Sequence, residues 1–188
     1  STPTRVGLID ASLNADQALL HDLGDVVPGL QELVDLHRTA NPTSDEVRSF
    51  FWFSPRHGYD VLPGLRRHRD WSTLRRRTTL AALASIHRSF DLVVADSDAD
   101  FEGESATGSI DIEDRNLLAR ELAKNADLVV LTARAGITGL SRALHALREL
   151  AELGVETDRI LLVILGAPRS TRHRSELSRT ILRLFDET

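Results

Sequence analysis

Two aspartates stand where metal-dependent chemistry would need them, each directly after a short apolar run. Asp10 follows VGLI, and Asp96 follows LVVA. If these runs are parallel strands, both carboxylates lie at the carboxyl ends of the sheet, where α/β domains collect their ligands. A carboxylate there can hold a magnesium ion when a phosphate group supplies further oxygen ligands. An aspartate after a strand also commonly caps a helix or closes a turn, so both roles stay open for each residue.

Acidic residues are concentrated in the segment 91–114. They include Asp96, Asp98, Asp100, Glu102, Glu104, Asp111, Glu113 and Asp114. Such a segment could bind a divalent cation. It is not an EF-hand, because Phe101 occupies the position of the required glycine and Thr107 that of the closing glutamate. A solvated acidic loop is the favoured interpretation.

Arginines are concentrated in the segment 56–77. The candidate patch consists of Arg66, Arg67, Arg69, Arg75, Arg76 and Arg77. Such a patch can bind nucleic-acid phosphates or an acidic protein surface. The alternative is a solvated face that pairs with the acidic segment of the same or a neighbouring subunit. The formal net charge of −5 favours this alternative and makes DNA binding the minority interpretation.

Composition removes several kinds of chemistry. The chain has no cysteine, which excludes disulfides, thiolate metal sites and cysteine nucleophiles and makes the cytoplasm the simplest location. No apolar run approaches the roughly 18 residues of a membrane span, and no signal peptide is recognisable. The histidines lack zinc-hydrolase spacing, and Ser105 does not lie in a G-x-S-x-G motif. We assign no catalytic residue from the sequence.

Continuous apolar runs predict buried strands, and the intervals between them predict helices. The strands are expected at 5–10, 59–62, 91–96, 127–132 and 160–165. This alternation predicts a single α/β domain over residues 1–188 with a doubly wound, mainly parallel sheet and helices on both faces. Thr43 and Glu46 predict a capping box, whereas Asn125 and Gly154 predict helix ends. The aromatic run 50–53 fits either core packing or an interface.

Several segments resemble the ParA/MinD family of P-loop ATPases in order and spacing. They are RVGLIDAS, GYDVLPGL, FDLVVADSDAD, NADLVVLTARAGITGLSRALHALREL and ILLVILGAPRS. Asp10 matches the first aspartate of the family's D-x-D element, and Asp96 matches the Walker B aspartate associated with magnesium. The resemblance implies a nucleotide site for ATP and Mg²⁺ at Asp10, Ser12, Asp96 and Asp98. It also implies a homodimer or another protein partner.

The chain departs from the family pattern at several of these positions. It has no glycine-rich phosphate loop, and its only lysine, Lys124, lies within an expected helix. Ser12 replaces the second aspartate of D-x-D, and Ser97 and Asp98 replace two prolines. Leu165 replaces an asparagine that can bind adenine, in an expected adenine-pocket region that also includes Pro168 and Arg169.

The missing phosphate loop also has a structural consequence. In this family its strand lies in the middle of the sheet, beside the Walker B strand. We therefore expect an upstream strand and phosphate loop to be missing from this chain. Either an upstream segment supplies that strand, or the sheet closes without it, or a neighbouring subunit provides one.

The resemblance leads to two functions of different classes. The first is a nucleotide-dependent switch in intracellular positioning or assembly with a degraded or incomplete ATP site, which would be an ATPase only if a phosphate loop is supplied upstream of Ser1. The alternative is a catalytically inactive pseudo-ATPase that serves as a protein-interaction scaffold. A phosphoacceptor receiver domain is less well supported, because it requires a lysine after its last strand and this chain has GAPRS there.

Overall fold

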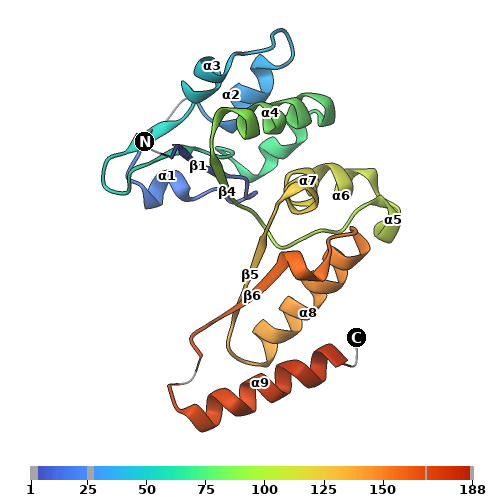
Figure 1. The fold of residues 1–188 in the computed structure, drawn as a ribbon. Coiled ribbons are helices and arrows are strands. Elements are labelled where there is room, and N and C mark those ends of the chain that lie inside the picture. Colours follow the sequence, from blue (N-terminus) through green and yellow to red (C-terminus); the bar gives the residue numbers. More distant parts are fainter. Residues whose placement is uncertain (1–3, 25–27, 168, 187–188) are drawn as a thin grey trace. The chain divides into compact units, whose positions relative to one another are not determined.

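The computed structural model describes residues 4–24, 28–167 and 169–186 (Figure 1). The chain divides into two compact units. The first consists of Ser1–Asp98 with Glu102–Glu121, and the second of Ala99–Phe101 with Leu122–Thr188. Helix α7 (Leu117–Asn125) contributes residues to both units. We describe each unit by itself.

The first unit contains a four-stranded sheet in the order β2-β3-β1-β4. Its strands are β1 (Val6–Asp10), β2 (Trp52–Ser54), β3 (Tyr59–Leu62) and β4 (Leu92–Asp96). Strand β1 runs parallel to both β3 and β4, whereas β2 pairs antiparallel with β3. The apolar runs predicted at 5–10, 59–62 and 91–96 therefore form parallel strands, as expected.

The other elements of the first unit are helices. They are α1 (Gln17–Leu20), α2 (Leu30–Leu36), α3 (Ser44–Arg48), η1 (His68–Thr73), α4 (Arg76–Ser89), α5 (Glu104–Thr107) and α6 (Ile110–Arg115). Helices α2 and α3 pack against α4, the longest of the set. Their fully buried side chains, with those of β1 and β3, form the core: Ile9, Leu30, Leu33, Val47, Val61, Leu62 and Ile86.

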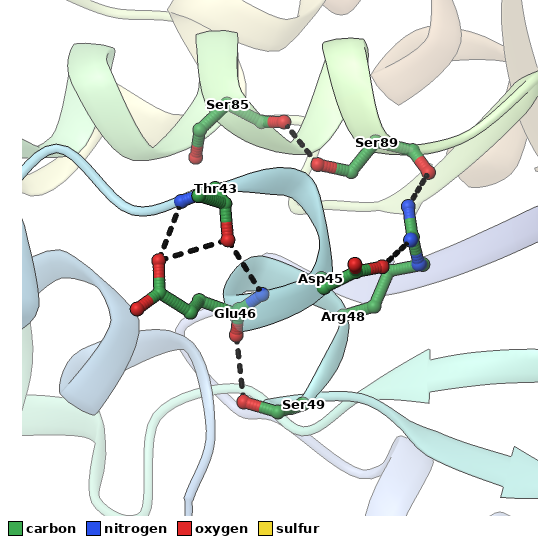
Figure 2. A network of polar contacts seen from close by, with 7 residues as sticks. All are labelled: Thr43, Asp45, Glu46, Arg48, Ser49, Ser85 and Ser89. Carbon is green, nitrogen blue, oxygen red and sulfur yellow. Dashed lines mark hydrogen bonds and ion pairs between the residues drawn. The ribbon is translucent and has the colours of Figure 1, made fainter.

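The predicted capping box at the start of α3 is present (Figure 2). The Glu46 backbone N–H donates to Thr43 Oγ1 over 3.3 Å, and the Thr43 N–H donates to Glu46 Oε2 over 2.7 Å. The last residue of α3, Arg48, donates to the Ser89 carbonyl at 3.2 Å and pairs with Asp45. The bond to Ser89 joins α3 to the end of α4, whereas the pair with Asp45 lies within α3.

The second unit pairs β5 (Val129–Arg134) with β6 (Ile160–Leu165) in parallel. Its other elements are α8 (Ile137–Glu152), η2 (Thr157–Arg159) and α9 (Thr171–Asp186). Leu131 and Ala133 of β5 are buried together with Leu140 and Leu150 of α8. Asn125 ends α7, and Gly154 follows α8 with a left-handed φ of 82°, so both predicted helix ends are confirmed.

The α/β class with mainly parallel strands is thus confirmed. Strand β2 was not expected; its first two residues, Trp52 and Phe53, belong to the aromatic run 50–53, and Ser54 follows that run. Phe51 is buried and its ring centroid lies 4.5 Å from that of Phe90, whereas Phe53 is 61% exposed. Core packing is therefore confirmed for Phe51, whereas the interface interpretation stays a prediction for the exposed Phe53.

Strand β4 is an edge of the first sheet within the described residues, since no strand pairs with its outer side. Leu92 and Val94 point to one face of β4 and are half-exposed. None of the described helices is long and apolar enough to cross a membrane.

Candidate functional site

The two strand-end aspartates lie side by side. Asp10 ends β1, Asp96 ends β4, and the parallel register pairs these two residues directly. The next backbone N–H, that of Ala11, donates to the Asp96 carbonyl over 2.7 Å. The structure therefore brings both predicted residues to the carboxyl end of the sheet.

Asp10 is completely buried, and its carboxylate is hydrogen-bonded to the backbone of the segment that follows it. Its carboxylate accepts the N–H of Gln17 at 2.8 Å and that of Ser12 at 3.4 Å. Burial raises the pKa of Asp10 to about 6, and the negative charge of Asp96 adds to this, while the two backbone bonds oppose it. Since both oxygens face backbone donors, this geometry matches the role of a turn and helix-start residue.

Gly64 closes the other side of Asp10. A Cβ atom at this position would lie 2.6 Å from the Asp10 carbonyl oxygen, 2.7 Å from the Ala15 Cβ and 3.0 Å from the Asp10 Cγ. Only a glycine allows the backbone after β3 to approach so closely. The VLPG segment 61–64 therefore covers the end of β1.

Asp96 differs from Asp10 because its side chain is exposed. One oxygen, Oδ2, accepts the side-chain amide of Gln17 at 2.6 Å. No described residue donates a hydrogen bond to the other oxygen, Oδ1. Asp96 is therefore the strand-end carboxylate with a free ligand atom.

Ser12 and Asp98 are bonded to each other. Ser12 Oγ donates to Asp98 Oδ1 at 3.0 Å, and the N–H of Leu13 donates to Asp98 Oδ2 at 2.7 Å. Together with the bonds from Gln17, these contacts attach the segment 11–17 to the ends of both β1 and β4.

Asp96 suits a magnesium ion, because an exposed carboxylate with one free oxygen is a hard ligand. The described residues contain no group of three His, Cys, Asp or Glu side chains that could hold a metal by themselves. A magnesium ion would therefore need phosphate oxygens as further ligands. The chain lacks a glycine-rich loop to cradle phosphates, and Lys124 lies in α7.

A pocket of about 360 Å³ lies elsewhere, at the amino ends of β1 and β4. Its arginines are Arg5, Arg48 and Arg88, accompanied by Asp45 and Asp91. Arg48 is bonded to Asp45, and the Arg5 N–H donates to Asp91 at 2.8 Å. Of these three arginines, only Arg48 has an ion pair within the described residues, and the pocket lies away from the strand-end aspartates.

Comparison with known proteins gives structural matches only, since neither a family model nor a curated protein matches the sequence. A ParA family ATPase from Chlorobium tepidum TLS superposes with a TM-score of 0.73 at 14% identity, covering 97% of this chain and 70% of that one. The chain has the ParA/MinD fold.

Two MinD structures share this fold. MinD in the MinC:MinD cell division complex of Aquifex aeolicus has a TM-score of 0.58 at 14% identity, over 94% of this chain and 66% of that one. The septum site-determining protein MinD of Pyrococcus horikoshii OT3, complexed with Mg-ADP, gives 0.59 at 15%, over 93% and 65%. This ParA/MinD-like chain thus spans about two thirds of the length of these proteins.

The expected adenine-pocket region of this ParA/MinD-like chain lies in the second unit. Leu165 ends β6, is 52% exposed, and accepts the N–H of Ala135 through its carbonyl at 2.9 Å. Arg169 is exposed, whereas Pro168 lies outside the described residues. The apolar side chain of Leu165 offers no hydrogen bond to a base.

All six arginines of the candidate patch are exposed. Arg66 pairs with Glu32, and Arg76 pairs with Glu113 at 3.3 Å and Glu121 at 3.0 Å. Glu113 belongs to the acidic segment, so the pairing interpretation holds for Arg76. Within the described ranges, no ion pair involves the other four: Arg67, Arg69, Arg75 and Arg77.

Sequence reasoning missed Gln17 and the aromatic cluster beside it. The carbonyl of Gln17 faces His21 Nδ1 at 2.9 Å, and His21 Nε2 faces the Tyr59 hydroxyl at 2.9 Å. Because a carbonyl only accepts, Nδ1 carries the proton. No sequence signal marks Gln17, since its partner Asp96 is 79 residues away.

Proposed function

We propose that this chain is the larger part of a ParA/MinD-like nucleotide-dependent switch with an incomplete ATP site, acting in intracellular positioning or assembly in the cytoplasm. The observation that carries the proposal is Asp96. It ends β4 beside Asp10 with one carboxylate oxygen free, in a fold whose solved representatives include a MinD complexed with Mg-ADP. Its partner is a second copy or another protein, and DNA at the arginine patch is the lesser alternative.

In this proposal one further strand with a phosphate loop, supplied by an upstream segment, completes a single doubly wound domain. The open edge of β4 supports the idea, because an unpaired strand leaves its outer N–H and C=O groups without sheet partners. The half-exposed Leu92 and Val94 support it further. A strand beside β4 followed by a helix would cover both features.

In this proposal the residues at the site have different roles. Asp96 would hold a magnesium ion, which would offset the charge of the phosphates. Buried Asp10 fixes the segment 11–17 through the N–H groups of Ser12 and Gln17. Ser12 supplies no anionic group near an attacking water, and it is instead bonded to Asp98. Hydrolysis is therefore weak, and nucleotide binding with dimerisation is the principal property.

The second candidate function is a pseudo-ATPase that keeps the fold as a scaffold for protein partners. The bond between Ser12 and Asp98 favours it, since that bond occupies two positions that the ParA/MinD pattern assigns to the nucleotide. Leu165 favours it as well, because it cannot hydrogen-bond adenine. In this case no nucleotide is bound in any form of the protein.

Equilibrium binding of ATP and ADP with Mg²⁺ tests the proposal. We would measure this chain and a version extended upstream along its gene, each with Asp96→Ala and with the control Asp127→Ala. Asp127 is exposed and precedes a strand instead of following one. Binding by the extended protein that only Asp96→Ala weakens supports the switch. If neither version binds, the scaffold function replaces it.

A further inference from the structure

Gln17 is bonded to both strand ends. Its backbone N–H donates to Asp10 Oδ2 at 2.8 Å, and its side-chain Nε2 donates to Asp96 Oδ2 at 2.6 Å. Its carbonyl accepts the backbone N–H of His21 at 3.0 Å, which forms the single turn of α1. One residue therefore joins β1, β4 and the first turn after the segment 11–17.

The contact with Asp96 has a specific chemical character. A side-chain amide carries no charge, so it orients a carboxylate without neutralising it, unlike an arginine or lysine. It occupies Oδ2 alone and leaves Oδ1 available. Hydrogen bonds of this kind are typical of the outer shell of metal sites, where they hold a ligating carboxylate in one orientation.

Beyond Gln17 the contacts continue to the turn between β2 and β3. His21 bonds to the Gln17 carbonyl and the Tyr59 hydroxyl through its two ring nitrogens. Its ring centroid lies 5.3 Å from that of His57, and His57 Nδ1 lies 3.0 Å from Ser54 Oγ. Helix α1 is thus fastened at one end to Asp96 and at the other to this turn.

We propose that Gln17 is a positioning residue, which orients Asp96 for a divalent cation and couples the Asp96 carboxylate to the order of α1. The cation part rests on the proposed function. The coupling part depends only on the contacts of this chain and can be tested without nucleotide.

Hydrogen exchange of the α1 amides tests the coupling. The amides of Leu20, His21 and Leu23 donate to backbone carbonyls within or beside α1. Gln17→Met keeps the length of the side chain but loses the donor, and we expect exchange of these amides to accelerate about ten-fold. Asp96→Ala should have the same effect, and the amides of α4 should remain unchanged as an internal control.

Swapping the amide and the carboxylate between positions 17 and 96 distinguishes the proposed coupling from a general loss of stability in the variants. Gln17→Glu alone places two carboxylates in contact and should also loosen α1. The double variant Gln17→Glu/Asp96→Asn restores an amide–carboxylate pair with its direction reversed, so protection of α1 should return. Unchanged exchange in Gln17→Met, or no recovery in the double variant, overturns the coupling. The control Gln31→Glu, in α2, should leave α1 unaffected.

Binding of Mg-ATP to the upstream-extended protein tests the cation part. Gln17→Met should weaken it about 10- to 100-fold, the usual effect of losing an outer-shell bond. The double variant should regain α1 protection without regaining affinity, because its carboxylate has moved. Wild-type affinity in Gln17→Met overturns the positioning role. If the unaltered protein does not bind Mg-ATP, the proposed function fails, while the exchange measurements still decide the coupling.

Discussion

The hydroxyl of Ser12 donates a hydrogen bond to the carboxylate of Asp98 across 3.0 Å. Taken singly, each residue departs from the ParA/MinD pattern, which has an acidic residue at the first position and a proline at the second. In space the two departures form one arrangement, because an aspartate at position 12 would face Asp98 with a like charge. The segment 11–17 and the chain after β4 are therefore adapted to each other.

Ser12→Asp should destabilise the protein by about 1–2 kcal/mol, because it removes this bond and places two carboxylates in contact. Urea denaturation would measure the change. Ser12→Asp/Asp98→Ser rebuilds the pair in reverse and should recover about 1 kcal/mol. Ser105→Asp, at an exposed serine of α5, should stay within about 0.5 kcal/mol of the unaltered protein. Equal losses in the single and double variants would contradict the pairing.

Asp10 should make stability fall as the pH rises from about 4 to 6. Its folded pKa, about 6, lies above its ordinary value of 3.8, so the folded state binds the proton more tightly. The stabilising effect is complete below 3.8 and is lost as the pH passes 6. The difference corresponds to roughly 3 kcal/mol.

The variant Asp10→Asn should lack this pH dependence, as measured by the free energy of unfolding between pH 4 and 7. Burial also raises the pKa of Asp60, but that residue contributes equally to both proteins. The comparison therefore isolates Asp10. Parallel stability curves would show that Asp10 titrates normally in the folded protein.

The sequence predicts five of the strands and the position of Asp10 and Asp96 at the carboxyl ends of two of them, for a physical reason. Buried parallel strands need continuous apolar runs, and parallel neighbours place their ends at the same edge. Strand β2 escaped prediction because it is only three residues long and one of its aromatic side chains is 61% exposed. The turn that pairs it with β3 contains Gly58, whose left-handed φ of 76° is a hairpin signal that a search for apolar runs does not use.

Side-chain partners far apart in the chain could not be predicted. Gln17 meets Asp96 and Ser12 meets Asp98 only because β1 and β4 are adjacent in the sheet. A single sequence reveals the strand ends but not which polar residues of the following segment turn back onto them. The close approach of the Gly64 backbone to Asp10 also joins residues that are far apart in the chain.

Gly64→Ala should destabilise the protein by about 1–3 kcal/mol, because the new methyl group meets backbone and side-chain atoms already in place. It would lie 2.6 Å from the Asp10 carbonyl oxygen and 2.7 Å from the Ala15 Cβ. Chemical denaturation would measure the loss. Adding Ala15→Gly removes one of the two clashes and should restore part of the stability. No loss in Gly64→Ala would mean that the VLPG segment lies farther from β1.

The start of α4 carries an unfavourable concentration of positive charge. Arg75 is its N-cap residue, Arg76 and Arg77 begin its first turn, and that turn contains no acidic residue. The amino end of a helix is already partially positive, so cations there reduce stability. Arg76 is compensated by Glu113 and Glu121, whereas Arg77 has no ion pair within the described residues.

Arg77→Glu and Arg76→Glu should therefore change stability in opposite directions, although they are adjacent and alter the net charge equally. Arg77→Glu places an anion at the positive end of α4 and should stabilise the protein by about 0.3–1 kcal/mol. Arg76→Glu also places an anion at the amino end of α4. It loses two ion pairs, however, and brings a third carboxylate close to Glu113 and Glu121, so it should destabilise the protein. Thermal denaturation at low ionic strength would measure both shifts. Salt should reduce them together, because exposed charges are screened, and shifts of the same sign would contradict the assignment of partners to Arg76.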